Sequence, residues 1–111
     1  MRNEVVLDGV VLRIGTVRYS PAGVPQVQLR LGHESVQEEA GHPRRVRFQA
    51  EVFAVGERLA AAVSRLRAGQ GIRVRGMLTR RSYRSEETNL VIHAHAIDRR
   101  DDGKDEENHR G

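Results

Sequence analysis

Apolar and polar residues alternate with a period of two along much of this chain, a pattern that is typical of half-buried β-strands. From residue 26 to residue 31, glutamine or arginine alternates with valine or leucine, which gives one polar and one apolar face. The same alternation starts again near Arg44 and near Ile72. A β-branched run from about Glu4 to Ile14 and a last run from about Asn89 to Ile97 complete a set of five predicted strands.

One segment, from about Glu57 to Arg67, has the helical period instead. Its apolar residues recur at the three- and four-residue spacing of a helix stripe, at Leu59, Ala62, Val63 and Leu66. Gly69 follows, where a glycine commonly ends a helix. The pattern therefore predicts a single short helix between the third and fourth strands.

Five strands with a helix after the third match the five-stranded Greek-key barrel of the OB fold, an all-β architecture. Several short antiparallel strands also suit a split sandwich, so the pattern alone leaves both architectures open. Polar stretches predict a loop at Ser35 to Pro43 and a hairpin tip at Ser82 to Thr88. The domain is predicted over residues 1–98, and residues 99–111 are predicted to form a disordered polar tail because they lack apolar side chains.

The charge of the chain adds a candidate ligand to this picture. Of its 19 basic residues, 18 are arginine, and between Arg58 and Ser85 there are eight arginines and no carboxylate. A field of one sign suits a nucleic-acid phosphate backbone, and the flat guanidinium group also stacks on bases. The alternative is a solvated surface in an arginine-rich proteome.

No arrangement of residues predicts catalysis. The absence of cysteine removes thiolate metal sites and a cysteine nucleophile, and it fits a reducing cytoplasm. His33, His93 and His95 are predicted to be half-buried and hydrogen-bonded, with a metal site as the alternative. We therefore predict no enzyme activity, catalytic residue, metal or cofactor. No stretch is long enough to cross a bilayer, so no membrane partner is predicted.

Basic residues on the polar strand faces are the best candidates for a binding site. Arg45 and Arg47 share the polar face of the third strand, and Arg80, Arg81 and Arg84 flank the last hairpin. In OB barrels, the face of the second and third strands and the loop between the fourth and fifth bind oligonucleotides. These arginines are therefore predicted to contact single-stranded DNA.

Aromatic residues, which stack on the bases of single strands, are few in this chain. Tyr83 is the only one in the last hairpin, and we predict that it stacks on a base, with an idle surface tyrosine as the alternative. Phe48 lies on the apolar face of its strand and is predicted to be in the core. Phe53 falls outside that apolar set, and a position beneath the helix is expected.

Two segments resemble known proteins. Residues 53–78, FAVGERLAAAVSRLRAGQGIRVRGML, resemble the helix and fourth strand of bacterial single-stranded DNA-binding proteins. Residues 19–41, YSPAGVPQVQLRLGHESVQEEAG, resemble more narrowly the primosomal replication protein N (PriB) family, with HESVQEEAG as a signature. The opening NEVVLDGVV and the closing LVIHAHAI fit this family as well, so the resemblance covers about residues 3–98.

The resemblance implies a homodimer of OB folds that binds single-stranded DNA during the restart of stalled replication forks. It also implies partnership with a PriA-type helicase and a DnaT-type loading factor, in the bacterial cytoplasm at the forks of the nucleoid. By position and chemistry it implies DNA contacts by Arg13, Arg18, Arg44, Arg80, Arg81 and Arg84. The chain departs from the family at His42 and Arg47, where stacking aromatics are expected, and this departure predicts weaker or more salt-sensitive DNA binding.

Two other functions fit the same sequence. A general single-stranded DNA-binding protein usually has an acidic tail with an apolar tip, whereas the last residues here, DEENHRG, contain no such tip. A protein-interaction adaptor with weak DNA binding is the second alternative, because stacking residues are scarce.

A second copy of the chain is predicted from the first strand, which carries apolar residues on both faces. One face must fill the barrel, and the other needs a cover that a partner chain supplies most simply. Cover by the helix or by the chain's own loops is the alternative. The two faces are Val5, Leu7 and Val11 on one side and Val6, Val10 and Leu12 on the other.

Overall fold

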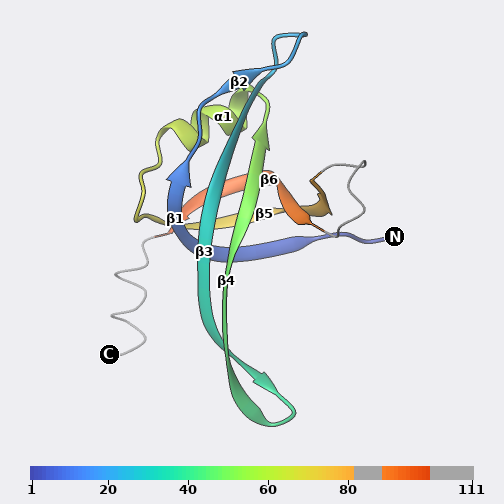
Figure 1. Ribbon diagram of the computed structural model, residues 1–111, viewed down its shortest axis with the longest axis vertical. Helices are drawn as coiled ribbons and strands as arrows, with labels where there is room; N and C mark the ends of the chain where they lie inside the picture. The colour runs from blue at the N-terminus through green and yellow to red at the C-terminus, as the bar shows by residue number, and fades with distance from the viewer. Residues whose placement is uncertain (82–88, 101–111) are drawn as a thin grey trace.

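The computed structural model describes residues 1–81 and 89–100, which form one helix and six strands (Figure 1). Tyr83, Arg84 and most of the predicted tail lie outside the described residues. In chain order the elements are β1 (Val5–Ile14), β2 (Arg18–Tyr19), β3 (Pro25–Glu39), β4 (His42–Val55), α1 (Glu57–Ser64), β5 (Gly71–Arg80) and β6 (Leu90–Arg100).

Five of the strands close into a barrel, which confirms the predicted OB fold. β1 pairs antiparallel with both β3 and β5, β3 pairs with β4, and β5 pairs with β6. A short parallel pairing between β4 and β6 completes the circle. The helix lies between β4 and β5 in the chain, as predicted. The two-residue β2, which was not predicted, pairs with the start of β3.

The barrel closes because β1 changes partners in its middle. Val10 lies opposite Gly71 of β5 and also opposite Gly32 of β3. A Cβ atom at Gly9 would lie 2.5 Å from the carbonyl oxygen of Gly32, too close for any side chain. The glycine in the middle of the first strand therefore allows the close backbone approach that a bend of this kind requires.

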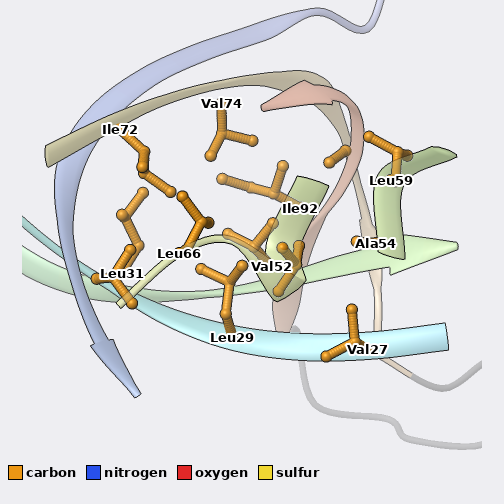
Figure 2. Packing of buried hydrophobic residues seen from close by; sticks show 13 residues of the cluster. Val27, Leu29, Leu31, Val52, Ala54, Leu59, Leu66, Ile72, Val74 and Ile92 are labelled. Carbon is orange, nitrogen blue, oxygen red and sulfur yellow. The ribbon is translucent and has the colours of Figure 1, made fainter. Parts of the chain in front are cut away.

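The core fills the barrel with aliphatic side chains from every long strand and the helix (Figure 2). The alternation on β3 places Val27, Leu29 and Leu31 inside, each at most 2% exposed. Leu59 and Val63 of α1 cover one end of this cluster. The apolar face predicted for β3 thus forms part of the interior, whereas Leu78 of β5, which the same period placed inward, is 40% exposed.

The helix is shorter than predicted and ends at Ser64 rather than near Arg67. The amide of Arg65 bonds the carbonyl of Ala62, and the amide of Leu66 bonds that of Val63. These bonds span three residues and tighten the last turn. Leu66 nevertheless stays buried at 7% exposure, so the apolar stripe continues beyond the helix.

The predicted loop from Ser35 to Pro43 is wrong, because β3 and β4 stay paired as far as Glu39 and His42. We call this paired extension, residues 34–39 of β3 and 42–47 of β4, the ribbon. Figure 1 shows this ribbon leaving the barrel. Ala40 and Gly41 have φ values of 53° and 80°, and positive φ at both central residues makes a two-residue hairpin turn. The ribbon covers no core along most of its length, so both of its faces carry polar side chains. Its sequence therefore has the composition of a loop.

The last strand also extends further than predicted. β6 continues to Arg100, so Arg99 and Arg100 belong to the barrel rather than to the tail expected from residue 99. The Nη1 atom of Arg100 lies 3.0 Å from Oδ2 of Asp8 on β1. Among the described residues, no helix is long and apolar enough to span a membrane.

Truncation of one core side chain tests this packing. Replacing Leu31, which is fully buried, with alanine is expected to lower the free energy of unfolding by about 2–5 kcal/mol, because a cavity replaces its contacts. Leu90→Ala, at a side chain that is 51% exposed, is the control and should change it by no more than about 0.5 kcal/mol. Chemical denaturation measures both, and equal losses would contradict the assignment of the core.

Candidate nucleic-acid interface

A polar groove lies on the outer face of the barrel where β1, β2, β3 and β4 meet. Its volume is about 410 Å³. Three arginines and a single carboxylate, Glu51, are among the residues that line it. The lining also includes the ring of Phe53 and the amides of Gln26 and Gln28. The groove thus combines positive charge, hydrogen-bonding groups and one aromatic surface.

Local strand geometry positions the arginines of this groove. Arg13 lies near the end of β1, just after an irregularity in its pairing with β3, and Arg18 begins β2. The backbone between them is held by the amide of Gly15, which donates to the carbonyl of Gln28 at 2.7 Å. Arg30 comes from the polar face of β3 that the alternation predicted. Arg13 and Arg18 are exposed, so their guanidinium groups are available to an anionic ligand.

Glu51 organises the basic groups at the edge of this groove. Both Nε and Nη2 of Arg30 donate to its Oε1, and Nε2 of Gln28 donates to its Oε2 at 2.7 Å. Nη2 of Arg81 lies 3.8 Å from the same Oε1 atom. Burial raises the pKa of the Glu51 carboxyl, but the hydrogen bonds from Gln28 and Arg30 and the two positive charges outweigh it, so the pKa is lowered. Glu51 is therefore a fixed anion that orients two arginines.

Phe53 lies on the outer face of the barrel, so the expected position beneath the helix is wrong. Its ring stacks on His93 of β6, its cross-strand partner, with centroids 5.2 Å apart and planes 12° apart. The guanidinium carbon of Arg81 lies over the Phe53 ring at 5.8 Å from its centroid. The side chain is half-buried and lines the groove.

The fold brings together only part of the predicted arginine set. Arg13 and Arg18 share the groove, and Arg81 reaches its edge through Glu51. Arg80 is exposed at the end of β5, and its predicted contact with DNA stays a prediction.

The arginines of the third predicted strand lie elsewhere, on the ribbon. Arg44 pairs with Glu39 at 2.8 Å, and Arg45 lies 3.8 Å from Glu34. Arg47 lines a different concavity. Tyr83 and Arg84 fall outside the described residues, so their predicted contacts with DNA stay predictions.

A second and larger concavity, of about 1210 Å³, lies between the outer face of β1 and the ribbon; we call it the hollow. Its lining includes Phe48, which is 43% exposed, so the predicted place of this residue in the core is wrong. Phe48 lies where the ribbon leaves the barrel, and its ring stacks on His33 with centroids 4.9 Å apart. Four more exposed apolar side chains line the hollow: Val6, Val10, Leu12 and Val36.

An ion-pair network lies at the β1 wall of the hollow. Nε and Nη2 of Arg73 donate to the two carboxylate oxygens of Asp8 at 2.7 and 3.0 Å, and Arg100 also pairs with this carboxylate. The hydrogen bond from Arg73 is the main reason why the pKa of Asp8 is lowered, and it outweighs the effect of burial. The hollow therefore contains apolar surface beside groups of both charges.

His33 and His93 are half-buried and engaged in local contacts, whereas His95 is exposed, so its predicted half-burial is wrong. Nδ1 of His33 lies 2.7 Å from the carbonyl oxygen of Asp8, and Nε2 lies 2.7 Å from Oγ of Ser35. His93 stacks on Phe53. In the part of the chain that the structure describes, no group of three or more acidic, histidine or cysteine side chains is placed to hold a metal ion.

Several residues of the groove escaped prediction from the sequence, among them Gln28, Arg30, Glu51 and Phe53. The signal was present for Phe53, because a strict period of two puts it on the polar face with Arg47 and Glu51. The partnership of Glu51 with Arg30 and Arg81 had no local signal, since pairing of distant strands creates it.

The chain is similar to known single-strand binding proteins over most of its length. Residues 3–96 match a family described as another single-strand binding protein family. The replication restart protein PriB of Enterobacter sp. (strain 638) is 35% identical over 103 residues, 93% of this chain and 99% of that protein.

Two solved structures share the fold. PriB from Ralstonia solanacearum gives a TM-score of 0.78 at 27% identity and covers 90% of this chain and 100% of its own. The single-stranded DNA binding protein from Thermus aquaticus gives a TM-score of 0.72 at 28% identity, covering 90% of this chain and 50% of its own.

The Glu51 network makes stability depend on pH in a defined direction. Because the folded-state pKa of Glu51 is lowered, its contribution is present above the unfolded pKa of about 4.3 and is lost as the pH falls through the folded value. Glu51→Gln is therefore expected to be less stable than the wild type at pH 7, and the difference should shrink below about pH 4. Urea denaturation across this range measures the effect. Glu38→Gln, at an exposed ribbon position, is the control; a pH-independent loss in Glu51→Gln would contradict the network.

Proposed function

This chain belongs to the single-strand binding protein family and, within it, to the replication restart protein PriB family, and on that premise we propose that it binds single-stranded DNA in the groove beside Phe53. Binding of this kind needs no catalytic group. The chemistry of the groove is the observation that carries the proposal: Arg13, Arg18 and Arg30 line it with a single carboxylate that is itself neutralised.

The groove suits a flexible single strand better than a duplex. Non-specific single-strand binding combines a positive groove that follows the phosphates with aromatic rings on which unpaired bases stack. Arg13 and Arg18 supply the charge, and Phe53 supplies the ring. The bases of a duplex are already stacked on one another, so they have no face to offer Phe53. In OB folds generally, this outer face and the adjoining loops hold oligonucleotides.

The proposed setting is the restart of replication forks in the bacterial cytoplasm. Relatives that are 33–35% identical over most of the chain are replication restart proteins PriB, which supports this role. The proposed protein partners are a PriA-type helicase and a DnaT-type loading factor. The chain would bind single-stranded DNA and the helicase together and so bridge them. The ribbon, which leaves the barrel, offers a surface for such contacts (Figure 1).

The DNA proposal is tested by neutralising the two exposed groove arginines together. The variant Arg13→Gln/Arg18→Gln is expected to bind a labelled oligothymidylate more weakly, because it loses phosphate contacts. The slope of log K against log salt should become shallower by about 0.7 for each lost contact. Fluorescence anisotropy over a salt series, with a duplex of the same length, measures both quantities.

A variant with equal charge loss provides the control for this experiment. Arg65→Gln/Arg67→Gln removes two exposed arginines just beyond α1, away from the groove, and should keep the wild-type slope. A wild-type chain that binds no single strand at low salt would overturn the DNA proposal and favour the protein adaptor. Equal effects of the two double variants would show that only net charge matters.

The second part of the proposal is a homodimer formed through the hollow. Val6 and Val10 of β1 are 58% and 40% exposed, and Val36 of the ribbon is 68% exposed. Apolar side chains gathered in one concavity favour a protein partner. The hollow also carries charges of both signs, Glu34 and Arg47 among them, which a two-fold copy of the same surface could pair across the interface.

A charge placed in this apolar surface is expected to separate the dimer. Val10→Asp should sediment as a monomer while keeping the far-ultraviolet circular dichroism of the wild type, because burial of an unpaired carboxylate at the interface is unfavourable. Val24→Asp, at a 39% exposed position in the turn before β3, is the control and should remain dimeric. Analytical ultracentrifugation distinguishes the two, and a monomeric wild type would contradict the interface.

A further inference from the structure

The chain contains two stacked phenylalanine–histidine pairs, and only one of them borders the groove. Phe48 and His33 face the hollow, whereas Phe53 lines the groove with His93 behind it. In the strand register, Phe53 lies between Gln28 of β3 and His93 of β6. Gln28 lines the groove and His93 does not, so the ring of Phe53 forms the boundary wall on that side.

We propose that this wall is a base-stacking subsite, where a single unpaired nucleobase packs on the groove side of the Phe53 ring. The inference rests on the proposed function and adds the group that receives a base. It also assigns Glu51 as a positioning residue, which acts through Arg30 and Arg81 rather than by touching the ligand.

The geometry around the ring suits a nucleobase. The near-parallel contact with His93 fixes the plane of the Phe53 ring, which lines the groove. Aromatic pairs at such separations are favourable, so the ring is ordered before a ligand arrives. A base is flat and apolar on its faces, and every base has such a face, so this subsite needs no particular sequence.

The polar groups beside the ring match the rest of a nucleotide. Gln28 and Arg30 lie on β3, the neighbouring strand, and both donate hydrogen bonds to Glu51. All three side chains line the groove. The guanidinium carbon of Arg81 lies over the ring at 5.8 Å from its centroid, and Nη2 of Arg81 lies 3.8 Å from Oε1 of Glu51. Glu51 thus holds two guanidinium groups, and this cluster of two positive charges and one negative charge keeps a net positive charge for the phosphates that flank the stacked base.

The subsite would supply a stacking ring that the chain lacks at the positions where the family resemblance predicts one. Stacking aromatics are expected at positions 42 and 47, which carry His42 and Arg47. Both of those residues are exposed on the ribbon, outside the groove. Phe53 provides an aromatic surface on the barrel itself, so the bound strand is placed across β3 and β4 rather than along the ribbon.

The absence of tryptophan from the chain permits a direct optical test. Phe53→Trp places a single tryptophan at the subsite, and stacking of a base is expected to quench its fluorescence on titration with an oligothymidylate of about 16 nucleotides. Ala61→Trp, at an exposed position on α1, is the matched control and should show no specific quenching.

Affinity provides an independent readout. Phe53→Leu keeps an apolar side chain but removes the ring, and it is expected to weaken single-strand binding on the order of tenfold. Its salt slope should remain that of the wild type, because no phosphate contact is lost. Thermal unfolding verifies that the variant is folded.

The outcomes separate this inference from the function on which it rests. Quenching in Phe53→Trp together with a weakened Phe53→Leu at unchanged slope supports the subsite. If the wild type binds single strands but Phe53→Trp is not quenched and Phe53→Leu binds normally, the subsite is wrong while the DNA-binding function stands. If the wild type binds no single strand, the function and the subsite fail together.

Discussion

The closure of the sheet through β1 is the constraint on which the rest of the structure depends. One strand must hydrogen-bond to β5 along its first half and to β3 along its second half, and both pairings meet at Val10. The backbones approach so closely there that Gly9 has no room for a side chain. Closure satisfies the strand edges and encloses the aliphatic core, and it also curves β3 and β4 so that their polar faces form the outer wall of the barrel.

This curvature divides the outer surface into two regions of different chemistry. The groove receives arginine, amide and aromatic groups from β1, β3 and β4, and the fixed carboxylate of Glu51 organises them. The hollow receives the apolar outer face of β1 and the ribbon. The two stacked phenylalanine–histidine pairs, one in each region, follow from the same pairing of β4 with its neighbours. In the proposed function, single-stranded DNA and a second copy of the chain would therefore bind to different surfaces.

The sequence predicted the strands that bury a face, because alternation such as that of Val27, Leu29 and Leu31 follows directly from the pleat. It failed at the ribbon, where both faces meet solvent and the polar composition from Ser35 onward resembles that of a loop. The predicted position of Phe53 beneath the helix was wrong because an aromatic side chain was expected to be buried. The period of two places it on the polar, outer face of β4. The contact of Glu51 with Arg81 could not be predicted, since it joins distant strands that only closure brings together.

The central claim is that single-stranded DNA lies across the groove and not in the hollow. An amide-detected NMR titration of the labelled protein with a short oligothymidylate tests this most directly, because it reports every backbone position at once. Binding in the groove is expected to shift Gly15, Arg18, Gln28 and Phe53, with changes that saturate together, and to leave Val6, Val10 and Val36 little changed. Shifts confined to the hollow and the ribbon, with the groove unchanged, would contradict it.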